Sequence, residues 1–150
     1  MAHPAPTPAV SYRLKRTFAH PPEKIFEAWT QAAALSRWFA PTDEYLAVVM
    51  ALDVRPGGAY RIEMRHSGGN VHTVSGTYVE VVRPSRLSFL WRWEDNPAWG
   101  ESLVTVDFRP VAAGCEMELV HDRFPDVPTM EAHEKGWTGC LGRLERLLGA

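Results

Sequence analysis

The sequence predicts an α+β fold in which one antiparallel sheet packs against a long C-terminal helix. Between residues 43 and 121, short stretches of alternating apolar and polar residues are separated by turns that contain Gly or Pro. This alternation indicates strands with one buried face, and the short turns indicate antiparallel neighbours. Over residues 130–148 the apolar residues recur every three or four positions instead, which is typical of an amphipathic helix.

Composition places the chain among folded domains. Its 150 residues are 45% apolar and 11% aromatic, which excludes a disordered chain. The formal net charge of −2 argues against a nucleic-acid partner, since such proteins usually carry a basic excess. The longest apolar run, Tyr45–Leu52, is too short to cross a bilayer, so we predict no membrane span.

The N-terminus and the cysteines give the expected domain limits and location. Residues 1–10 contain three prolines and no apolar core of signal-peptide type, so we expect a flexible tail before a single domain over residues 11–150. Cys115 and Cys140 form neither a CxxC motif nor a metal-ligand spacing. We expect two buried thiols in a reducing compartment, and therefore a cytoplasmic protein.

One strand and two short helices are expected first. Residues 11–19 alternate as a strand, and the prolines of the following His20–Glu23 segment favour a first helical turn. Thr30 is a candidate N-cap for the second helix, which Pro41 ends. The apolar faces of the two helices are Ile25, Phe26 and Trp29, and then Leu35, Trp38 and Phe39.

Six further strands follow, and the C-terminal helix covers them. The predicted strands are residues 45–54, 59–66, 71–82, 87–93, 102–108 and 115–121, separated by turn signals. One face of such a sheet must be covered, and only the C-terminal helix is long enough to do so. Gly136, Gly139 and Gly142 inside this helix either let it bend or let backbone or a ligand approach closely.

Four ordered segments carry a resemblance to a known family. They read RTFAHPPEKIFEAWTQAAALSRWFAP, DVRPGGAYRIEM, GTYVEVVRPSRLSFLW and HEKGW, and together they extend from about Tyr12 to Leu148. The sequence resembles the heat-shock-protein-90 ATPase-activator homologue family, of the START-like or SRPBCC superfamily. The resemblance implies a helix-grip fold: a seven-stranded antiparallel sheet curled around the C-terminal helix, two short helices after the first strand, and a hydrophobic cavity between sheet and helix.

The apolar strand faces are the candidate walls of such a cavity. Alternate residues on four strands share an inward face, and the C-terminal helix adds its own apolar face. Together they line either a cavity or a filled core. The apolar candidate ligand-binding residues are Met64, Phe89, Trp91, Trp93, Val104, Val106, Phe108, Met117, Leu119, Trp137 and Leu141.

Four polar residues are candidate pocket groups. His66 and His121 lie near strand ends, where they could act as hydrogen-bond donors or as a general base, or be solvated. His133 begins a motif that resembles HExxH, but Trp137 occupies the second histidine position, so no zinc site is predicted. His133 matches the family pattern and is expected to pack or to line the pocket, and Glu134 points toward the cavity or toward solvent.

No catalytic residue, metal site or cofactor is predicted. The sequence has no GxSxG motif, and neither cysteine has a histidine or aspartate at a recognised spacing. Gly57-Gly58 stands between two strands and is therefore a turn rather than a phosphate-binding loop. Glu94-Asp95 lies in a loop that either borders a cavity mouth or forms a solvated turn.

Three functions are compatible with these observations. The first is binding of an apolar or aromatic small molecule between the sheet and the C-terminal helix, as superfamily relatives bind lipids, polyketides or plant hormones. The second is a cyclase or hydrolase that uses the same pocket, which requires at least two converging titratable groups. The third is a chaperone- or regulator-interacting module with an exposed apolar patch, for example around Trp99; a homodimer is also compatible with the sequence.

The chaperone hypothesis comes from the family name alone. That name refers to a eukaryotic co-chaperone in which this module is one part. The present sequence is expected to hold a single module without the separate chaperone-binding domain, so the resemblance does not by itself predict chaperone activation.

Overall fold

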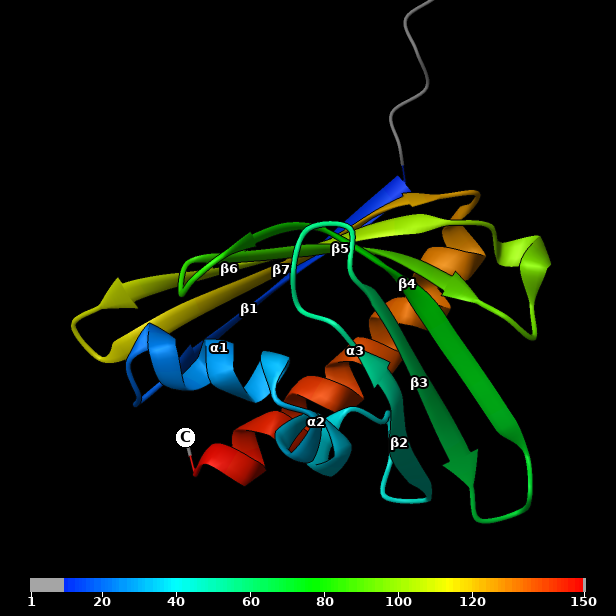
Figure 1. The fold of residues 1–150 in the computed structure, drawn as a ribbon, viewed down its shortest axis with the longest axis horizontal. Helices are drawn as coiled ribbons and strands as arrows, with labels where there is room; N and C mark the ends of the chain where they lie inside the picture. Colours follow the sequence, from blue (N-terminus) through cyan, green and yellow to red (C-terminus); the bar gives the residue numbers. More distant parts are fainter. Residues whose placement is uncertain (1–9, 150) are drawn as a thin grey trace, which may run out of the picture.

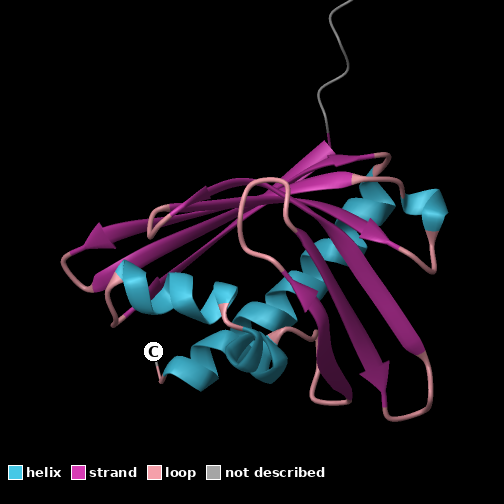
Figure 2. Cartoon of the chain, viewed as in Figure 1, coloured by secondary structure: helices cyan, strands magenta, loops and turns pink. Residues whose placement is uncertain are grey.

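The computed structural model describes residues 10–149, so the tail predicted for residues 1–10 lies outside the described part except for Val10. A seven-stranded antiparallel sheet carries the helices on its concave side (Figures 1 and 2). The elements are β1 (Val10–Phe18), α1 (Pro22–Thr30), α2 (Ala32–Trp38), β2 (Tyr45–Leu52), β3 (Ala59–His66), β4 (Val71–Val82), β5 (Arg86–Trp93), η1 (Pro97–Trp99), β6 (Ser102–Val111), β7 (Gly114–Phe124) and α3 (Val127–Leu148).

The strand order is β1-β7-β6-β5-β4-β3-β2. Strands β2 to β7 form a meander, and β1 extends the sheet at the outer edge of β7. Strands β2 to β7 each pair with the next along the chain, whereas β1 pairs with β7, with Leu14 opposite Leu119. Helices α1 and α2 carry the chain from β1 at one edge to β2 at the other. The structure therefore confirms the predicted α+β helix-grip fold, with two short helices after the first strand.

The start of α2 differs from the prediction. Thr30 is the last residue of α1, and its hydroxyl donates to the carbonyl oxygen of Phe26 at 2.9 Å instead of capping α2. Gln31 takes the N-cap position without a side-chain hydrogen bond. A threonine hydroxyl inside a helix can bond the carbonyl four residues earlier, and Thr30 does so at the C-terminal end of α1.

Helix α3 begins with a side-chain cap and crosses the concave face of the sheet. Asp126 accepts a hydrogen bond from the amide of Thr129 at 2.8 Å, which satisfies one of the free amides of the first turn. The helix therefore starts at Val127, before the first residue of the predicted apolar period. Its buried stripe includes Trp137, Leu141 and Leu144, and Gly149 ends it in a left-handed conformation.

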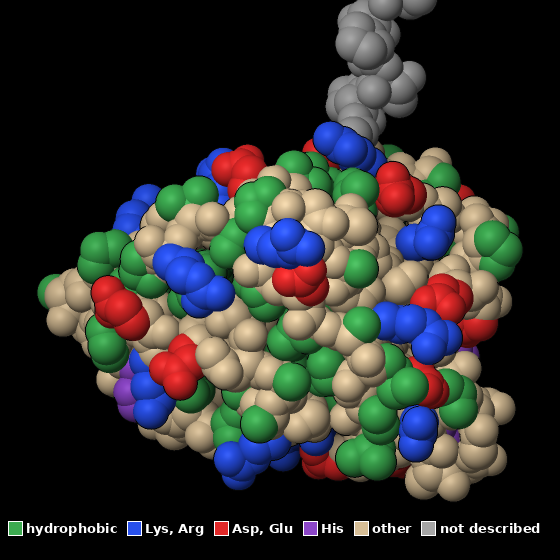
Figure 3. All heavy atoms as spheres, in the orientation of Figure 1, with side chains coloured by type: hydrophobic (Ala, Val, Ile, Leu, Met, Phe, Trp, Pro, Cys, Tyr) green, Lys and Arg blue, Asp and Glu red, His purple; other side chains and the backbone are tan. Residues whose placement is uncertain are grey.

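The core is a continuous layer between sheet and helices. The inward residues from Val104 to Phe108 on β6 and from Cys115 to His121 on β7 are buried to 2% exposure or less, as strict alternation requires. Both cysteines are buried free thiols, as predicted. Basic and acidic side chains are interspersed over the face shown in Figure 3, and no helix within residues 10–149 is long and apolar enough to cross a membrane.

Candidate functional site

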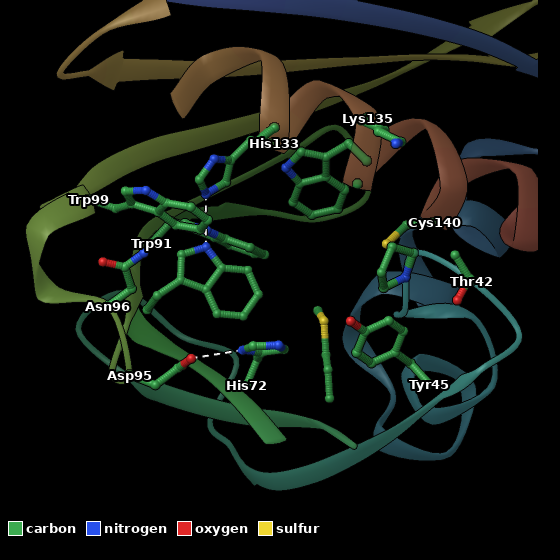
Figure 4. A pocket seen from close by; sticks show the side chains of 16 residues that line it. Thr42, Tyr45, His72, Trp91, Asp95, Asn96, Trp99, His133, Lys135 and Cys140 are labelled. Atoms are coloured by element: carbon green, nitrogen blue, oxygen red, sulfur yellow. Dashed lines mark hydrogen bonds and ion pairs between the residues drawn. The ribbon is translucent and has the colours of Figure 1, made fainter. Parts of the chain in front are cut away.

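A pocket of about 540 Å³ lies between α3 and the β2–β5 half of the sheet (Figure 4). We call it the aromatic pocket because tryptophan, tyrosine and histidine rings form much of its wall. The loop that follows β5 borders one end, and the segment before β2 borders the other. The lining residues are Pro41, Thr42, Tyr45, Met64, His72, Trp91, Trp93, Asp95, Asn96, Trp99, Ala132, His133, Lys135, Gly136, Trp137 and Cys140.

Three tryptophans form the inner wall of the aromatic pocket. Trp91 and Trp93 project from β5 on the same face because strand side chains alternate. The ring of Trp91 lies 5.1 Å from that of Trp137 on α3 and 5.5 Å from that of Trp93. Trp99, from η1, extends this wall with its ring 4.9 Å from that of His133. Trp93 and Trp99 are partly exposed and offer rigid apolar surface, whereas Trp91 and Trp137, at most 4% exposed, form the floor beneath them.

His133 joins α3 to the sheet at the pocket wall. The indole N–H of Trp93 donates to Nε2 of His133 at 2.8 Å, so the imidazole proton is on Nδ1, which donates to the carbonyl oxygen of Thr129 at 2.8 Å. Burial lowers the pKa of His133, and the bond to Thr129 opposes this only in part. Because both ring nitrogens are engaged, His133 positions the wall and is not free to bind a metal.

His121 lies behind the wall, fully buried in the core. Its Nδ1 accepts from the indole N–H of Trp137 at 3.0 Å, which places the proton on Nε2, and Nε2 donates to Oγ of Ser102 at 2.7 Å. Burial, together with the nearby His133, holds the pKa of His121 well below its usual range. This neutral imidazole fixes the orientation of Trp137.

A histidine and a carboxylate form the polar side of the aromatic pocket. His72, on β4, holds Nδ1 2.8 Å from Oδ2 of Asp95, and Oδ1 of Asp95 accepts from the amide of Thr73 at 3.0 Å. Burial raises the pKa of Asp95, but the bonds from His72 and Thr73 outweigh it and leave the pKa below the usual value. Asp95 is therefore an ionised acceptor that orients the imidazole.

Two glycines of α3 have different roles at the aromatic pocket. A Cβ added at Gly136 would have no atom within 4 Å, so the missing side chain leaves space in the pocket. A Cβ at Gly139 would clash with the backbone carbonyl of Pro41, so this glycine lets α3 approach the chain before β2. The alternatives drawn from the sequence, bending or close approach, are thus resolved at Gly139 in favour of close approach.

Comparison with known proteins agrees with this architecture. The model of the family described as Activator of Hsp90 ATPase homolog 1-like protein matches residues 19–149. The chain belongs to this family. The AHSA1-like assignment confirms the resemblance to the START-like superfamily, and a search of curated proteins gave no match.

Several solved structures share the fold over nearly the whole chain. A protein from Chromobacterium violaceum is 30% identical over 93% of this chain and 97% of its own, with a TM-score of 0.85. The AHSA1 protein from Silicibacter pomeroyi is 29% identical over 93% and 98%, with a TM-score of 0.82. A protein from Arthrobacter aurescens is 17% identical over 93% and 86%, with a TM-score of 0.83, and shows the fold alone.

The structure separates the candidate residues of this AHSA1-like chain into two groups. The candidates that line the aromatic pocket are Met64, Trp91, Trp93, His133 and Trp137. The candidates outside its lining are His66, Phe89, Val104, Val106, Phe108, Met117, Leu119, His121, Glu134 and Leu141.

Most candidates outside the lining are packed core residues. Phe89 borders a second space of only about 20 Å³, room for no more than a water molecule. His66 is the last residue of β3, where Nε2 bonds Glu44 at 3.0 Å and Nδ1 accepts from the amide of Gly68 at 2.9 Å. His66 and His121 thus belong to separate networks, and Glu134 is half-buried on α3.

Several lining residues were not among the candidates. His72 shares its strand face with the buried Val74, and Asp95 continues the alternation of Trp91 and Trp93. Strand alternation was therefore the sequence pattern that could have placed both on the pocket side of the sheet. The side chain of His72 is 44% exposed, as is ordinary for a surface residue. Part of this exposed surface of His72 faces the aromatic pocket.

Cys140 also lines the aromatic pocket but is not activated. Burial raises the pKa of its thiol to about 12, although the charge of Arg143 opposes this. The thiol is therefore protonated at neutral pH, and it contributes a small apolar surface to the wall.

Proposed function

We propose that this protein binds an apolar, predominantly aromatic small molecule in the aromatic pocket. The observation that supports the proposal is a volume of about 540 Å³ walled by tryptophan rings, which lies within the range of small-molecule sites. Flat ligands would bury their faces against the partly exposed Trp93 and Trp99, over the floor that the buried Trp91 and Trp137 form. The rigidity of these rings keeps the entropic cost of ordering the wall low.

The hydrogen bonds behind the wall support a preformed site. Trp93 is held by His133, and Trp137 is held by His121, so two of the three rings are fixed before any ligand arrives. Preorganisation of this kind increases affinity because less freedom is lost on binding. A cytoplasmic location and a homodimer stay predictions from the sequence.

The catalytic alternative rests on different residues from those expected. His66, His121 and Glu134 were the groups for acid–base chemistry, but none of them lines the aromatic pocket. His72 and Asp95 are the titratable pair that does converge there. Binding therefore remains the proposed function.

A space-filling substitution tests the proposal. Gly136→Phe would place a ring in the aromatic pocket, while Gly142→Phe adds the same ring to α3 at a glycine outside the lining that also has open space. The probe is 2-methoxynaphthalene, titrated by isothermal calorimetry. Wild type and Gly142→Phe are expected to bind it, and Gly136→Phe is expected to lose at least tenfold in affinity.

Equal binding by the folded Gly136→Phe variant would contradict the proposal, as would the absence of any binding to the wild type. Circular dichroism melts of the two variants establish that both are folded. Because glycine is unfavourable inside a helix, neither variant is expected to lose helix content.

A further inference from the structure

The geometry of His72 and Asp95 points to one chemical class of ligand. We propose that the aromatic pocket selects aromatic molecules that carry a hydroxyl group, whose O–H donates to Nε2 of His72. Asp95 acts as the positioning residue that keeps the imidazole in the accepting tautomer. This inference rests on the proposed function and specifies what the pocket prefers.

The tautomer of His72 follows from its partner. Asp95 has only acceptor oxygens when ionised, so the bond of 2.8 Å between Oδ2 and Nδ1 requires the proton on Nδ1. In the neutral imidazole this leaves Nε2 as a lone-pair acceptor. Among residues 10–149 no protein group hydrogen-bonds Nε2, and Figure 4 shows the ring extending into the pocket with Asp95 at its other nitrogen.

The location of His72 joins this acceptor to the aromatic wall. His72 pairs across the strands with Met64, and its ring lies 6.4 Å from that of Trp93 and 6.3 Å from that of Tyr45. A planar ligand seated against Trp93 would therefore bring its edge to the imidazole. The edge group that satisfies an acceptor is a donor, and a phenolic O–H is a strong neutral one.

Charge around His72 disfavours the competing class, an aromatic carboxylate. A carboxylate at Nε2 would meet a lone pair backed by the negative charge of Asp95. Lys135 is the cation of the pocket lining, but it is exposed, so water and salt screen its attraction for an anion. A neutral hydroxyl avoids the repulsion and uses the acceptor.

The experiment compares three matched probes at about pH 8, above the usual titration range of imidazole. The probes are 2-naphthol, 2-methoxynaphthalene, which lacks the donor, and 2-naphthoate, which carries a negative charge. Isothermal calorimetry on the wild type is expected to give at least tenfold tighter binding of 2-naphthol than of either other probe. His72→Phe keeps a ring but no acceptor, and it is expected to bind 2-naphthol and 2-methoxynaphthalene equally.

Two substitutions serve as controls, because they change similar groups outside the pocket lining. His66→Phe removes a histidine from the end of β3, and Glu94→Gln removes a charge from the same loop as Asp95, where Glu94 is paired with Arg61 at 2.9 Å. Both are expected to keep the preference for 2-naphthol. Asp95→Asn is expected to reduce the preference severalfold, because Asn can present either a donor or an acceptor to Nδ1.

A spectroscopic measurement separates positioning by Asp95 from a general structural effect. Long-range ¹H–¹⁵N spectra of the imidazole rings are expected to show His72 with the proton on Nδ1 in the wild type and a mixture of tautomers in Asp95→Asn. The His72→Phe spectrum assigns the signals. A single Nδ1–H tautomer in Asp95→Asn would overturn the role given to Asp95.

The outcomes distinguish this inference from the proposed function. If the wild type binds 2-methoxynaphthalene as tightly as 2-naphthol, or if the preference survives in His72→Phe, the hydroxyl inference is overturned while the pocket still binds aromatic molecules. Tighter binding of 2-naphthoate overturns it in favour of anions. If the wild type binds none of the three probes, both proposals fail.

Discussion

Trp93 of β5 and His133 of α3 share a hydrogen bond of 2.8 Å that ties the sheet to the C-terminal helix at the wall of the aromatic pocket. Each partner is fixed in turn, His133 by the carbonyl of Thr129 and Trp93 by its strand. The bond sets the imidazole tautomer and the indole orientation together. It therefore links the stability of the domain to the shape of the pocket.

Breaking this bond is expected to destabilise the protein. In a double-mutant cycle of Trp93→Phe and His133→Phe, the coupling free energy is expected to be about 1 kcal/mol, the usual net value of a buried hydrogen bond. Urea denaturation of the four proteins measures it. Additive effects, with a coupling near zero, would show that the contact contributes packing alone.

The glycines of α3 should respond in opposite directions to alanine. Gly139→Ala is expected to lower the free energy of unfolding by more than about 1 kcal/mol, because its Cβ would clash with the backbone of Pro41. Gly142→Ala has open space and is expected to raise it by about 0.5–1 kcal/mol through helix propensity. Urea denaturation midpoints compare the two variants. The same sign of change in both would contradict the described approach of α3 to Pro41.

Stability should fall as the pH is lowered from about 7 to about 5. The unfolded chain binds a proton at His121 below about pH 6.5, whereas the folded chain, in which the pKa of His121 is depressed, does not. Protons therefore favour the unfolded state, by up to about 1.4 kcal/mol per pH unit for each such group. Urea denaturation at several pH values measures the slope.

The His121→Gln variant is the comparison for this pH dependence. Glutamine does not titrate and retains a donor and an acceptor for Ser102 and Trp137. The variant is expected to be less stable at neutral pH but to show a shallower slope between pH values of about 7 and 5. An unchanged slope would mean that the burial of neutral His121 does not control acid stability.

Periodicity was sufficient for the fold but not for the boundary between core and pocket. Alternation on β6 and β7 correctly predicted that residues such as Val106 and Leu119 face inward, and both are fully buried. The alternation along a strand tells which face of the sheet a side chain lies on. It does not tell whether a side chain from a helix fills the space opposite that face. Phe108 meets Phe26 of α1, with ring centroids 5.4 Å apart, whereas Trp91 and Trp93 face the part of α3 that holds Gly136.

The polar side of the pocket could not be predicted from the sequence either, because its residues stand at positions that are usually solvated. His72 stands next to a turn, and Asp95 follows a strand, and both positions are ordinary for solvated residues. Only the folded chain brings Nδ1 of His72 to within 2.8 Å of Asp95 across 22 intervening residues. Conversely, the burial of His121 follows from its partners Trp137 and Ser102, neither of which is near it in sequence.

The six tryptophans offer the most direct test of the central claim, that aromatic molecules bind between the sheet and α3. The measurement is a titration with 2-methoxynaphthalene followed through the indole N–H signals in ¹H–¹⁵N spectra. The signals of Trp91, Trp93, Trp99 and Trp137 are expected to shift, because these rings line the aromatic pocket. The signal of Trp38, the fully buried last residue of α2, is expected to stay in place. No shift at all, or a shift of Trp38 without the four, would contradict the account.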